Sequence, residues 1–383
     1  MKIGIVDADL LDNGTNYPNL AVMKMASYYK NEGNEVDLIV DYNEVDKFDK
    51  IMISKVFTKT KVPVDVLKMK NVSVGGTGFF YDKAEPLPCY IEHSSPDYDI
   101  YRKYVEGEKL KGNSKKLKYY TDYSIGFTTR GCIRGCEFCV NRNSRESVRH
   151  SSLSEFVNAN HKKITLWDDN ILACKDWKFI LGELQETGKK FKFQQGLDFR
   201  LLTREKMEVL KDLNYDGDFI FAFDNIKDKT LIIKNLKLWN EIVKKQARFY
   251  VFCGFENLEG SKDLEDLFER ISILMNYKHI PYIMRHENYT NSKHEKLYIN
   301  VARWCNQPSF FKSKSFREFA QANQSSIKTV GKLSSCMKAL KDIENDFDWI
   351  SYKYFDMKFN KEETVKEKVK LGSMEVEQLK WII

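Results

Sequence analysis

The sequence predicts an α/β protein built from parallel sheets, with an open sheet at the amino terminus, a partial barrel of about six β/α repeats, and a small, mainly helical carboxyl-terminal region. Short apolar segments of strand length alternate with longer segments whose apolar residues recur at helical spacing. One stretch rich in proline, lysine and tyrosine interrupts this alternation, which ends near residue 308. Parallel sheets of this kind carry their functional loops at the strand ends.

The first 83 residues are predicted to form an open, doubly wound α/β domain. Apolar residues at helical spacing predict a helix over Leu20–Asn31. The pair Gly75-Gly76 has two interpretations, a simple turn of the chain or a place where the backbone approaches a ligand. Four short strands are predicted, at Lys2–Asp7, Glu35–Val40, Lys50–Ser54 and Val72–Val74.

Residues 84–120 are predicted to be a linker, because three prolines are followed by a run of lysines and tyrosines. Seven Lys or Arg residues lie between positions 101 and 120, against two Glu residues. This composition suits phosphate contacts and base stacking, but a solvated linker has the same composition and is the interpretation we adopt. The interleaved tyrosines are Tyr101, Tyr104, Tyr119 and Tyr120.

Residues 121–308 repeat the strand–helix alternation and are predicted to form the partial barrel, short of the eight repeats of a closed one. The predicted strands are Tyr123–Thr128, Lys163–Trp167, Lys192–Gln195, Asp218–Phe223, Arg248–Cys253 and Tyr282–Arg285. The intervening helices are predicted near residues 151–160, 174–188, 203–213, 227–245 and 261–277. Residues 309–383 are polar with helical spacing, and they carry no motif.

Composition excludes several classes of protein. The 383 residues include 19 Gly, 7 Pro and 8 Cys, which rules out collagen-like, low-complexity and disulfide-scaffold chains. Lys and Arg exceed Asp and Glu by 62 − 55 = 7, a mild basic excess that is compatible with a phosphate-bearing partner. No apolar run approaches the roughly 20 residues of a membrane helix, and the acidic start is unlike a signal peptide. We therefore expect a cytoplasmic protein without a membrane partner.

Three of the eight cysteines lie within eight positions, in the loop that follows the first predicted barrel strand. Cys132, Cys136 and Cys139 can supply three thiolates to one inorganic cluster, and three ligands leave one iron of a 4Fe–4S cube open. A closed zinc site needs four ligands, for which Cys174 is the only approximate candidate. The spacing therefore favours a 4Fe–4S site.

With its CxxxCxxC spacing and the aromatic Phe138 before the last cysteine, the sequence resembles the radical S-adenosylmethionine superfamily over residues 120–305. The resemblance implies that the three cysteines ligate a 4Fe–4S cluster whose open iron chelates S-adenosylmethionine. Reductive cleavage then gives a 5′-deoxyadenosyl radical that abstracts hydrogen from a substrate, with electrons from a flavodoxin- or ferredoxin-type donor. The resemblance places Phe138 beside the adenine.

The resemblance also implies cofactor contacts at the ends of later barrel strands. Asp168 and Asp169 stand where the family has a short Gly-Gly-Glu stretch that holds the amino group of S-adenosylmethionine, although the glycines are absent here. Arg200 suits the methionine carboxylate and Gln195 suits the ribose. Each residue has a second interpretation as a helix cap or surface turn. The candidate cofactor-binding residues are Asp168, Asp169, Gln195, Arg200, Asp224 and Asn225.

The amino-terminal domain resembles the Rossmann-like, cobalamin-binding domain of cobalamin-dependent radical enzymes, through its strand order and the Gly75-Gly76 pair. It lacks the histidine that ligates cobalt in many relatives, since no His occurs before His93. Cobalamin is therefore possible but not favoured, and we expect a domain that shapes the substrate cavity. A cobalamin-dependent radical methyltransferase is the alternative function.

The loop after the cysteines is rich in arginine and predicts an anionic substrate. Arg142, Arg145 and Arg149 would flank the mouth of the site and grip an anion, or they belong to a flexible surface loop. The substrate is expected to be phosphate-bearing or of nucleic-acid type. An alternative of another class is a non-enzymatic metal- or nucleic-acid-binding module that uses the cysteines structurally.

Overall fold

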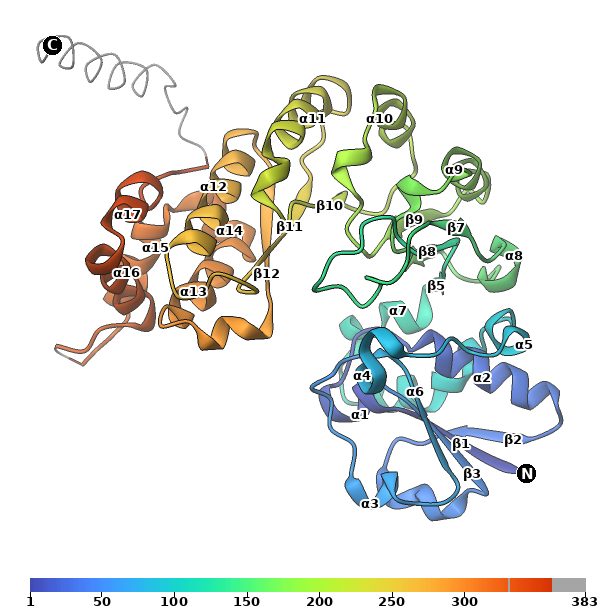
Figure 1. Ribbon diagram of the computed structural model, residues 1–383. Coiled ribbons are helices and arrows are strands. Elements are labelled where there is room, and N and C mark those ends of the chain that lie inside the picture. The colour runs from blue at the N-terminus through green and yellow to red at the C-terminus, as the bar shows by residue number, and fades with distance from the viewer. Residues whose placement is uncertain (330, 360–383) are drawn as a thin grey trace, which may run out of the picture. The chain divides into compact units, whose positions relative to one another are not determined.

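The structure, a computed structural model, describes residues 1–329 and 331–359 (Figure 1). Residues 360–383, the last part of the region predicted to be helical, lie outside the described residues. No helix within the described ranges is long and apolar enough to cross a membrane.

The chain divides into two compact units. The first unit consists of Met1–Leu197 together with Asp212–Gly217. The second unit consists of Asp198–Lys211 and the described residues from Asp218 onward. The candidate cysteines and the predicted amino-terminal sheet belong to the first unit.

Four parallel strands form the amino-terminal sheet in the order β2-β1-β3-β4, which confirms the open parallel sheet predicted for this region. Ile5 pairs with Leu38 on one side and with Met52 on the other, so β1 is a central strand. The carboxyl ends of all four strands share one edge, where ligand sites are expected. The strands are β1 (Lys2–Asp7), β2 (Glu35–Leu38), β3 (Lys50–Ser54) and β4 (Val72–Gly75).

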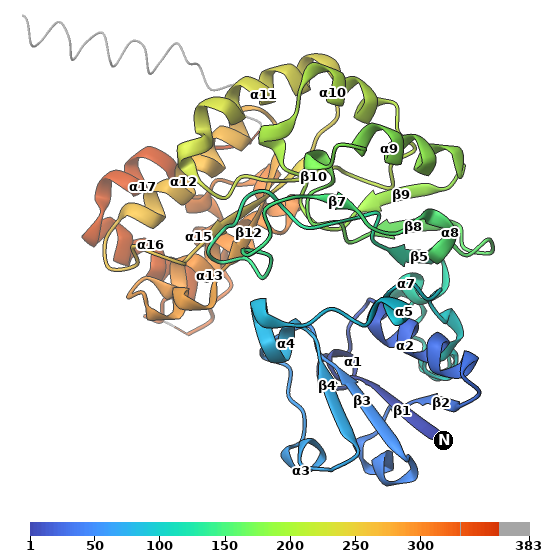
Figure 2. The ribbon, with the colours of Figure 1, turned by 45° about the vertical axis from the view of Figure 1, so that its right-hand side comes forward.

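Helices cover both faces of this sheet, because side chains alternate between the faces along each strand. Ile5 faces the core that contains α2 (Leu20–Asn31), a helix predicted from the sequence. Ile53 belongs to the opposite face, which packs with α3 (Val64–Leu67). Figure 2 shows α2 and α3 on opposite sides of the sheet. Two short helices follow β1 and β4, α1 (Ala8–Asn13) and α4 (Thr77–Phe80).

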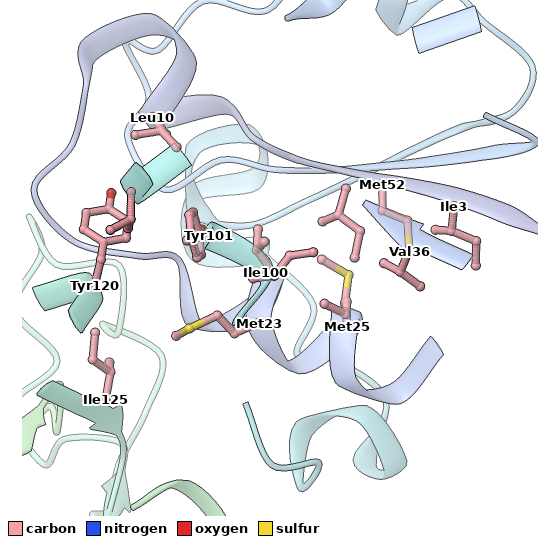
Figure 3. Close-up of a cluster of buried hydrophobic side chains, with 14 of the residues drawn as sticks. Ile3, Leu10, Met23, Met25, Val36, Met52, Ile100, Tyr101, Tyr120 and Ile125 are labelled. Atoms are coloured by element: carbon pink, nitrogen blue, oxygen red, sulfur yellow. The ribbon is translucent and has the colours of Figure 1, made fainter. Parts of the chain in front are cut away.

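The prediction that residues 84–120 form a linker is wrong. This segment folds into short helices that pack on the same face of the amino-terminal sheet as α2 (Figure 3). Ile100, Tyr101 and Tyr120 are each at most 7% exposed and belong to that core, while Leu110 is 91% exposed. The lysines that suggested a linker alternate with these core residues. The elements are α5 (Cys89–Glu92), η3 (Tyr98–Tyr101), α6 (Arg102–Leu110), η4 (Ser114–Lys116) and α7 (Lys118–Thr121).

A second parallel sheet in the first unit has the order β5-β8-β9. Thr165 lies in the middle strand, paired with Ile125 on one side and with Lys192 on the other. One face of the sheet is close-packed, because a Cβ at Gly126 would lie 2.4 Å from the ring of Phe156. The strands are β5 (Tyr123–Gly126), β8 (Lys163–Leu166) and β9 (Lys190–Phe193). The helix α8 (Leu153–Phe156) precedes β8 and α9 (Trp177–Glu186) follows it.

The second unit holds a third parallel sheet, in the order β10-β11-β12. Its strands are β10 (Ile220–Ala222), β11 (Arg248–Cys253) and β12 (Ile280–Arg285), and its helices are α10 (Arg204–Lys211), α11 (Lys229–Ile242) and α12 (Lys262–Asn276). The six predicted barrel strands are therefore present, but they form two hydrogen-bonded sheets of three. A single six-stranded barrel stays a prediction.

The described part of the carboxyl-terminal region is helical, as the sequence predicts. Several of its aromatic residues lie in the core of the second unit, where Phe268 of α12 contacts Phe316, Tyr354 and Phe355, whereas Tyr352 is 85% exposed. Its helices are α14 (Pro308–Ser313), α15 (Phe316–Ser325), α16 (Ser335–Asp346) and α17 (Asp348–Tyr354). The helix α13 (Glu295–Cys305) precedes them, within the region predicted to form the barrel.

Candidate functional site

The three clustered cysteines lie on one loop of the first unit, after the carboxyl end of β5. Two short antiparallel strands, β6 (Thr129–Arg130) and β7 (Val148–Arg149), close this cysteine loop, residues 131–147, at its base. Cys132, Cys136 and Cys139 are partly exposed. Cys174 is buried, 3% exposed. Three accessible thiols therefore share one short, tied loop.

Two aspartates that follow β8 hold the cysteine loop in place. Asp168 is buried, and its carboxylate accepts hydrogen bonds from the backbone N–H groups and the hydroxyls of Thr128 and Thr129. Asp169 accepts from the N–H of Gly131 at 2.8 Å and from Nδ2 of Asn141 at 2.5 Å. Burial raises the pKa of Asp168, and these four hydrogen bonds oppose the increase. In this structure Asp168 binds the base of the loop and Asp169 binds the loop itself. Their predicted contact with S-adenosylmethionine stays a prediction.

Gly131 is required where it stands. It has a φ of +90°, and a Cβ there would lie 2.4 Å from the carbonyl oxygen of Glu146. Both strands of the loop base therefore approach too closely for any other residue. This close approach places Cys132 directly beside the β6–β7 pair, where its N–H donates to Oγ of Ser144 at 3.0 Å.

Two of the cysteine sulfurs accept hydrogen bonds from nitrogen. The backbone N–H of Asn141 donates to Sγ of Cys139, and Nδ2 of Asn170 donates to Sγ of Cys132, each at 3.4 Å. Such donors stabilise thiolates and the ligand sulfurs of iron–sulfur clusters. The donor set therefore fits an iron–sulfur cluster with three protein ligands. The described conformation, however, brings no three Cys, His, Asp or Glu side chains into an arrangement that could hold a single metal ion.

A buried charge cluster supports the base of the loop, and no pattern in the sequence indicates it. The carboxylate of Glu92 lies 2.9 Å from Nζ of Lys24, 3.3 Å from Arg130 and 3.5 Å from Nε2 of His150. Burial, followed by the charge of Arg130, lowers the pKa of His150 to about 4. The imidazole is therefore neutral at pH 7, and Glu92 pairs with the lysine and the arginine.

The segment after α4 contacts the cysteine loop directly. Tyr81, in the short helix η2 (Tyr81–Lys83), donates from its hydroxyl to the backbone carbonyl of Phe138 at 2.8 Å. Arg142 lies 2.7 Å from the carboxylate of Asp82, and this hydrogen bond lowers the pKa of that carboxyl. Tyr81 has a φ of +51°, a conformation that costs energy for a residue other than glycine. The amino-terminal sheet is thereby tied to the cysteine loop at Phe138, whose predicted contact with adenine stays a prediction.

The three arginines predicted to grip an anion have internal partners in this structure. Arg142 pairs with Asp82, Arg145 donates to the carbonyls of residues 142 and 144, and Arg149 binds the carboxylate of Glu183 at 2.6 and 2.8 Å. These contacts hold the loop together and do not leave a free cationic mouth. The arrangement therefore gives the anion-binding prediction no support at these positions.

The other predicted cofactor residues fall in different settings. Gln195 is exposed just after β9. In the second unit, Arg200 pairs with Asp198 at 2.7 Å and with Asp228 at 2.9 Å. Asn225 accepts from the N–H of Lys227 and so starts the short helix Ile226–Asp228, which is the helix-cap interpretation of this residue. None of these contacts tests a cofactor role.

Arg270 is a buried cation at the carboxyl ends of β10 and β11, beside the half-buried Asp224. Arg270 is 2% exposed and donates to the carbonyls of residues 223, 224 and 252. Burial raises the pKa of Asp224 to about 6, against the opposing charges of Arg270 and Arg200. Beyond β11, a shallow hollow of about 690 Å³ is lined by residues 255–262 and Asn291. The sequence does not single out Arg270, because an arginine in an amphipathic helix normally faces solvent.

The carboxyl edge of the amino-terminal sheet is filled by the chain itself. Asp7 accepts from the hydroxyl of Tyr101 at 2.7 Å, and Asp9 accepts from the N–H of Val56 at 2.7 Å and from the hydroxyl of Thr60 at 2.5 Å. A Cβ at Gly76 would lie 2.3 Å from the carbonyl oxygen of residue 55. The close approach at Gly76 is therefore an approach to the chain's own backbone.

No protein-family model matches the sequence, and no curated protein matches it. Two solved structures align with the chain. The apo, selenomethionine-labelled form of OxsB, described as a cobalamin-dependent S-adenosylmethionine radical enzyme, has a TM-score of 0.36 and 13% identity over 94% of this chain and 57% of its own. SuiB from Streptococcus suis, bound to S-adenosylmethionine, has a TM-score of 0.33 and 11% identity over 66% of this chain and 71% of its own. The chain thus spans 57% of the length of OxsB, and the proposal below depends on the chain's own residues.

Proposed function

We propose that the chain is an enzyme of the radical S-adenosylmethionine type. It would bind a 4Fe–4S cluster through Cys132, Cys136 and Cys139, cleave S-adenosylmethionine reductively, and abstract hydrogen from a substrate. One observation carries the proposal: three accessible thiols share a tied loop at the carboxyl end of a parallel strand, and two of their sulfurs accept N–H hydrogen bonds.

When bound, the cluster supplies a low-potential electron and one open iron for the amino acid end of S-adenosylmethionine. The chain's own residues have distinct tasks around it. The donors of Asn141 and Asn170 favour the thiolate form of Cys139 and Cys132 and tune the potential. Asp169 fixes both ends of the stretch between Gly131 and Asn141 that carries all three cysteines. A flavodoxin- or ferredoxin-type protein would deliver the electron.

The cysteine loop would have to draw its thiols together around the cluster, because the described conformation holds no ready metal site. The loop is suited to such a change, since its ends are tied by β6 and β7 while residues 131–147 contain no other strand or helix. The contacts of Tyr81 and Asp82 would restrict that movement to the cysteine stretch.

Anaerobic reconstitution with iron and sulfide, followed by reduction and measurement of 5′-deoxyadenosine, tests the proposal. Alanine at Cys132, Cys136 or Cys139 should remove both the iron–sulfur absorbance and the cleavage, because each thiolate supplies one of three ligand bonds. Cys174→Ala is the matched control and should retain both. A cluster lost in Cys174→Ala would indicate a four-cysteine site, and a bound metal without any cleavage would indicate the non-enzymatic module.

A further inference from the structure

The two faces of the β5-β8-β9 sheet differ in chemistry. Residues that pair across parallel strands share a face, so Tyr123, Thr165 and Lys192 belong to the same one. The opposite face presents Leu166, Phe193 and other fully buried apolar side chains. The face of Thr165 also carries Ile125, its cross-strand neighbour, which is buried in the core of the amino-terminal sheet, so the lysine and the hydroxyl groups lie beside apolar packing. We refer to this face as the polar face.

Four aromatic rings lie along the polar face. Tyr17, from the loop before α2, lies with its ring centroid 4.1 Å from that of Tyr119 and 5.2 Å from that of Trp167. Tyr119 lies 4.6 Å from Tyr123. The rings form one continuous row whose members come from three separate stretches of the chain. The rings offer a flat apolar surface, and the phenol groups of Tyr17 and Tyr119 lie beside Lys192.

Positive charge on the polar face exceeds negative charge. Lys163 pairs with Asp216 at 2.7 Å, and this carboxylate also accepts from the hydroxyl of Tyr123. Nζ of Lys192 lies 4.7 Å from the ring centroid of Tyr119 and donates to its hydroxyl, and Nζ of Lys118 lies 5.0 Å from the same ring. In the part of the chain that the structure describes, neither Lys118 nor Lys192 has a carboxylate within ion-pair distance. Lys190 shares this face but is exposed, whereas Lys118, Lys163 and Lys192 pack on the tyrosine rings. These three lysines against one aspartate leave a net charge of 3 − 1 = +2.

A second observation points to a missing acceptor at the same place. Thr165 is fully buried, and its hydroxyl has no hydrogen-bond partner among the described residues. It is the cross-strand neighbour of Lys192 on the polar face. An unpartnered buried hydroxyl is costly and uncommon, whereas one that serves a ligand is satisfied when the ligand binds. Burial also lowers the pKa of Lys192.

We propose that the polar face binds an anionic group, a carboxylate or a phosphate, that belongs to the substrate of the proposed enzyme. Lys192 supplies the charge-assisted hydrogen bond, Thr165 supplies a hydroxyl donor, and Lys118 adds charge at the edge. A purely structural cluster would satisfy Lys192 as Lys163 is satisfied, with a carboxylate. The assignment of the anion to a substrate rests on the proposed function. The existence of the anion site does not depend on that function.

Pyridoxal 5′-phosphate is a suitable probe, because it joins a reactive aldehyde to an aromatic ring and a phosphate. Its aldehyde condenses with an unprotonated amine and releases water, and borohydride then adds hydride to the imine and fixes the label as a secondary amine. With limiting reagent, peptide mapping by mass spectrometry should find Lys192 labelled about tenfold faster than Lys190, an exposed lysine on the same strand. Pyridoxal, which lacks the phosphate, should lose this preference.

Matched variants and competitors sharpen the test. Lys118→Gln and Thr165→Val should each slow labelling of Lys192 several-fold, while Lys190→Gln should leave it unchanged. Protection by pyrophosphate but not by citrate would identify a phosphate ligand, and the reverse would identify a carboxylate. Calorimetric titration of the protecting anion should show binding to the wild type and its loss in Lys192→Gln.

Equal labelling of Lys190 and Lys192, or equal labelling by pyridoxal with and without its phosphate, would overturn the anion site. So would calorimetry that finds the same binding in Lys192→Gln as in the wild type. The labelling requires no cluster, so its failure is distinguishable from a failure to cleave S-adenosylmethionine. Selective labelling without any cleavage would keep the anion site and remove the proposed enzyme.

Discussion

Buried polar side chains in the first unit have different energetic consequences, which depend on whether the chain supplies their partners. Asp168 is buried among four hydrogen-bond donors, and Asp9 among three. Thr165 is equally buried and has none among the described residues. Satisfied groups of this kind stabilise one conformation of a loop, whereas an unsatisfied one lowers stability until a ligand arrives.

Thr165→Val should raise the free energy of unfolding by about 1 kcal/mol, because valine has nearly the same shape and removes a buried hydroxyl that lacks a partner. Chemical denaturation of the reduced protein measures the change. Thr60→Val is the matched control and should lower the free energy of unfolding by about 1–3 kcal/mol, since the Thr60 hydroxyl donates to Asp9. A loss of stability in Thr165→Val equal to that in Thr60→Val would show that the hydroxyl has a partner.

Because of Asp7, the free energy of unfolding should fall as the pH rises. Burial raises the pKa of its carboxyl from 3.8 to about 6, so the folded state keeps a proton that the unfolded state releases between these values. The stability associated with this group is therefore fully present below pH 3.8 and is lost as the pH passes 6, by roughly 3 kcal/mol in all. Asp7→Asn removes this dependence. The difference in free energy of unfolding between the Asp7→Asn variant and the wild type, measured against pH, should grow across that window and then level off; a constant difference would contradict it.

Some residues of the site were predictable and others were not. The cysteines follow from a fixed spacing, which is local in the sequence and needs no tertiary contact. Asp168 and Asn225 were correctly placed at strand ends, but the same residue types bind cofactors, cap helices and fix loops, and only the observed partners separate these roles. Lys192 was predicted merely as the first residue of a strand, because register across strands decides which side chains it meets.

At the scale of elements, residues 84–120 show how composition misleads. Prolines and lysines are typical of linkers, but here Pro86 and Pro88 precede the short helix α5 and Pro96 follows it. Lys103 and Lys109 lie on the exposed side of α6. The core positions fall singly or in pairs among polar residues, so no window of the sequence looks apolar. They are Ile91, Ile100, Tyr101, Val105, Leu117 and Tyr120. The short helices of this segment are stabilised by packing on the amino-terminal sheet, because their local sequence alone does not favour them.

Ile100→Ala should lower the free energy of unfolding by about 2–4 kcal/mol, because Ile100 is 7% exposed in the core of the amino-terminal sheet. Leu110→Ala lies in the next helix at 91% exposure and should change it by less than about 0.5 kcal/mol. Urea denaturation compares the two. Equal, small effects would restore the interpretation of this segment as a linker.

Asp169→Ala should loosen the cysteine loop without unfolding the protein. The variant removes the acceptor of Gly131 and Asn141, which lie on either side of the three cysteines. We expect the iron content after reconstitution to fall several-fold, while the melting temperature shifts by only a few degrees. The control is Asp176→Asn, since this residue starts α9 without a side-chain cap bond and should retain the iron. Full iron content in Asp169→Ala would show that the loop is held by other contacts.

At the scale of the whole molecule, the sequence predicted the strands better than their assembly. Strand identity depends on local apolar patterns, which is why all six barrel strands and four amino-terminal strands are observed near their predicted positions. Whether strands join in one barrel depends on hydrogen bonds between segments distant in the sequence. The observed pairing stops at β9 on one side and β10 on the other, where Asp198–Lys211 passes to the second unit.

The amino-terminal sheet should not retain a corrinoid. Its carboxyl edge is filled by Asp7 and Asp9 with their partners Tyr101 and Thr60, and Gly76 packs on the chain's own backbone. Protein purified from cells supplied with hydroxocobalamin should therefore show no corrinoid bands in its visible spectrum. Stoichiometric corrinoid would contradict this and would favour the cobalamin-dependent methyltransferase.

Through Tyr17, the loop before α2 contributes to the proposed substrate site on the polar face and takes no part in the cysteine loop. Tyr17 reaches the polar face from the loop before α2, while the cysteines occupy a different loop of the same unit. A change in the length or sequence of residues 14–19 would alter what the polar face accepts without touching a single thiol. Homologous chains could therefore diverge in substrate by variation in that one loop, and their cluster loops would remain interchangeable.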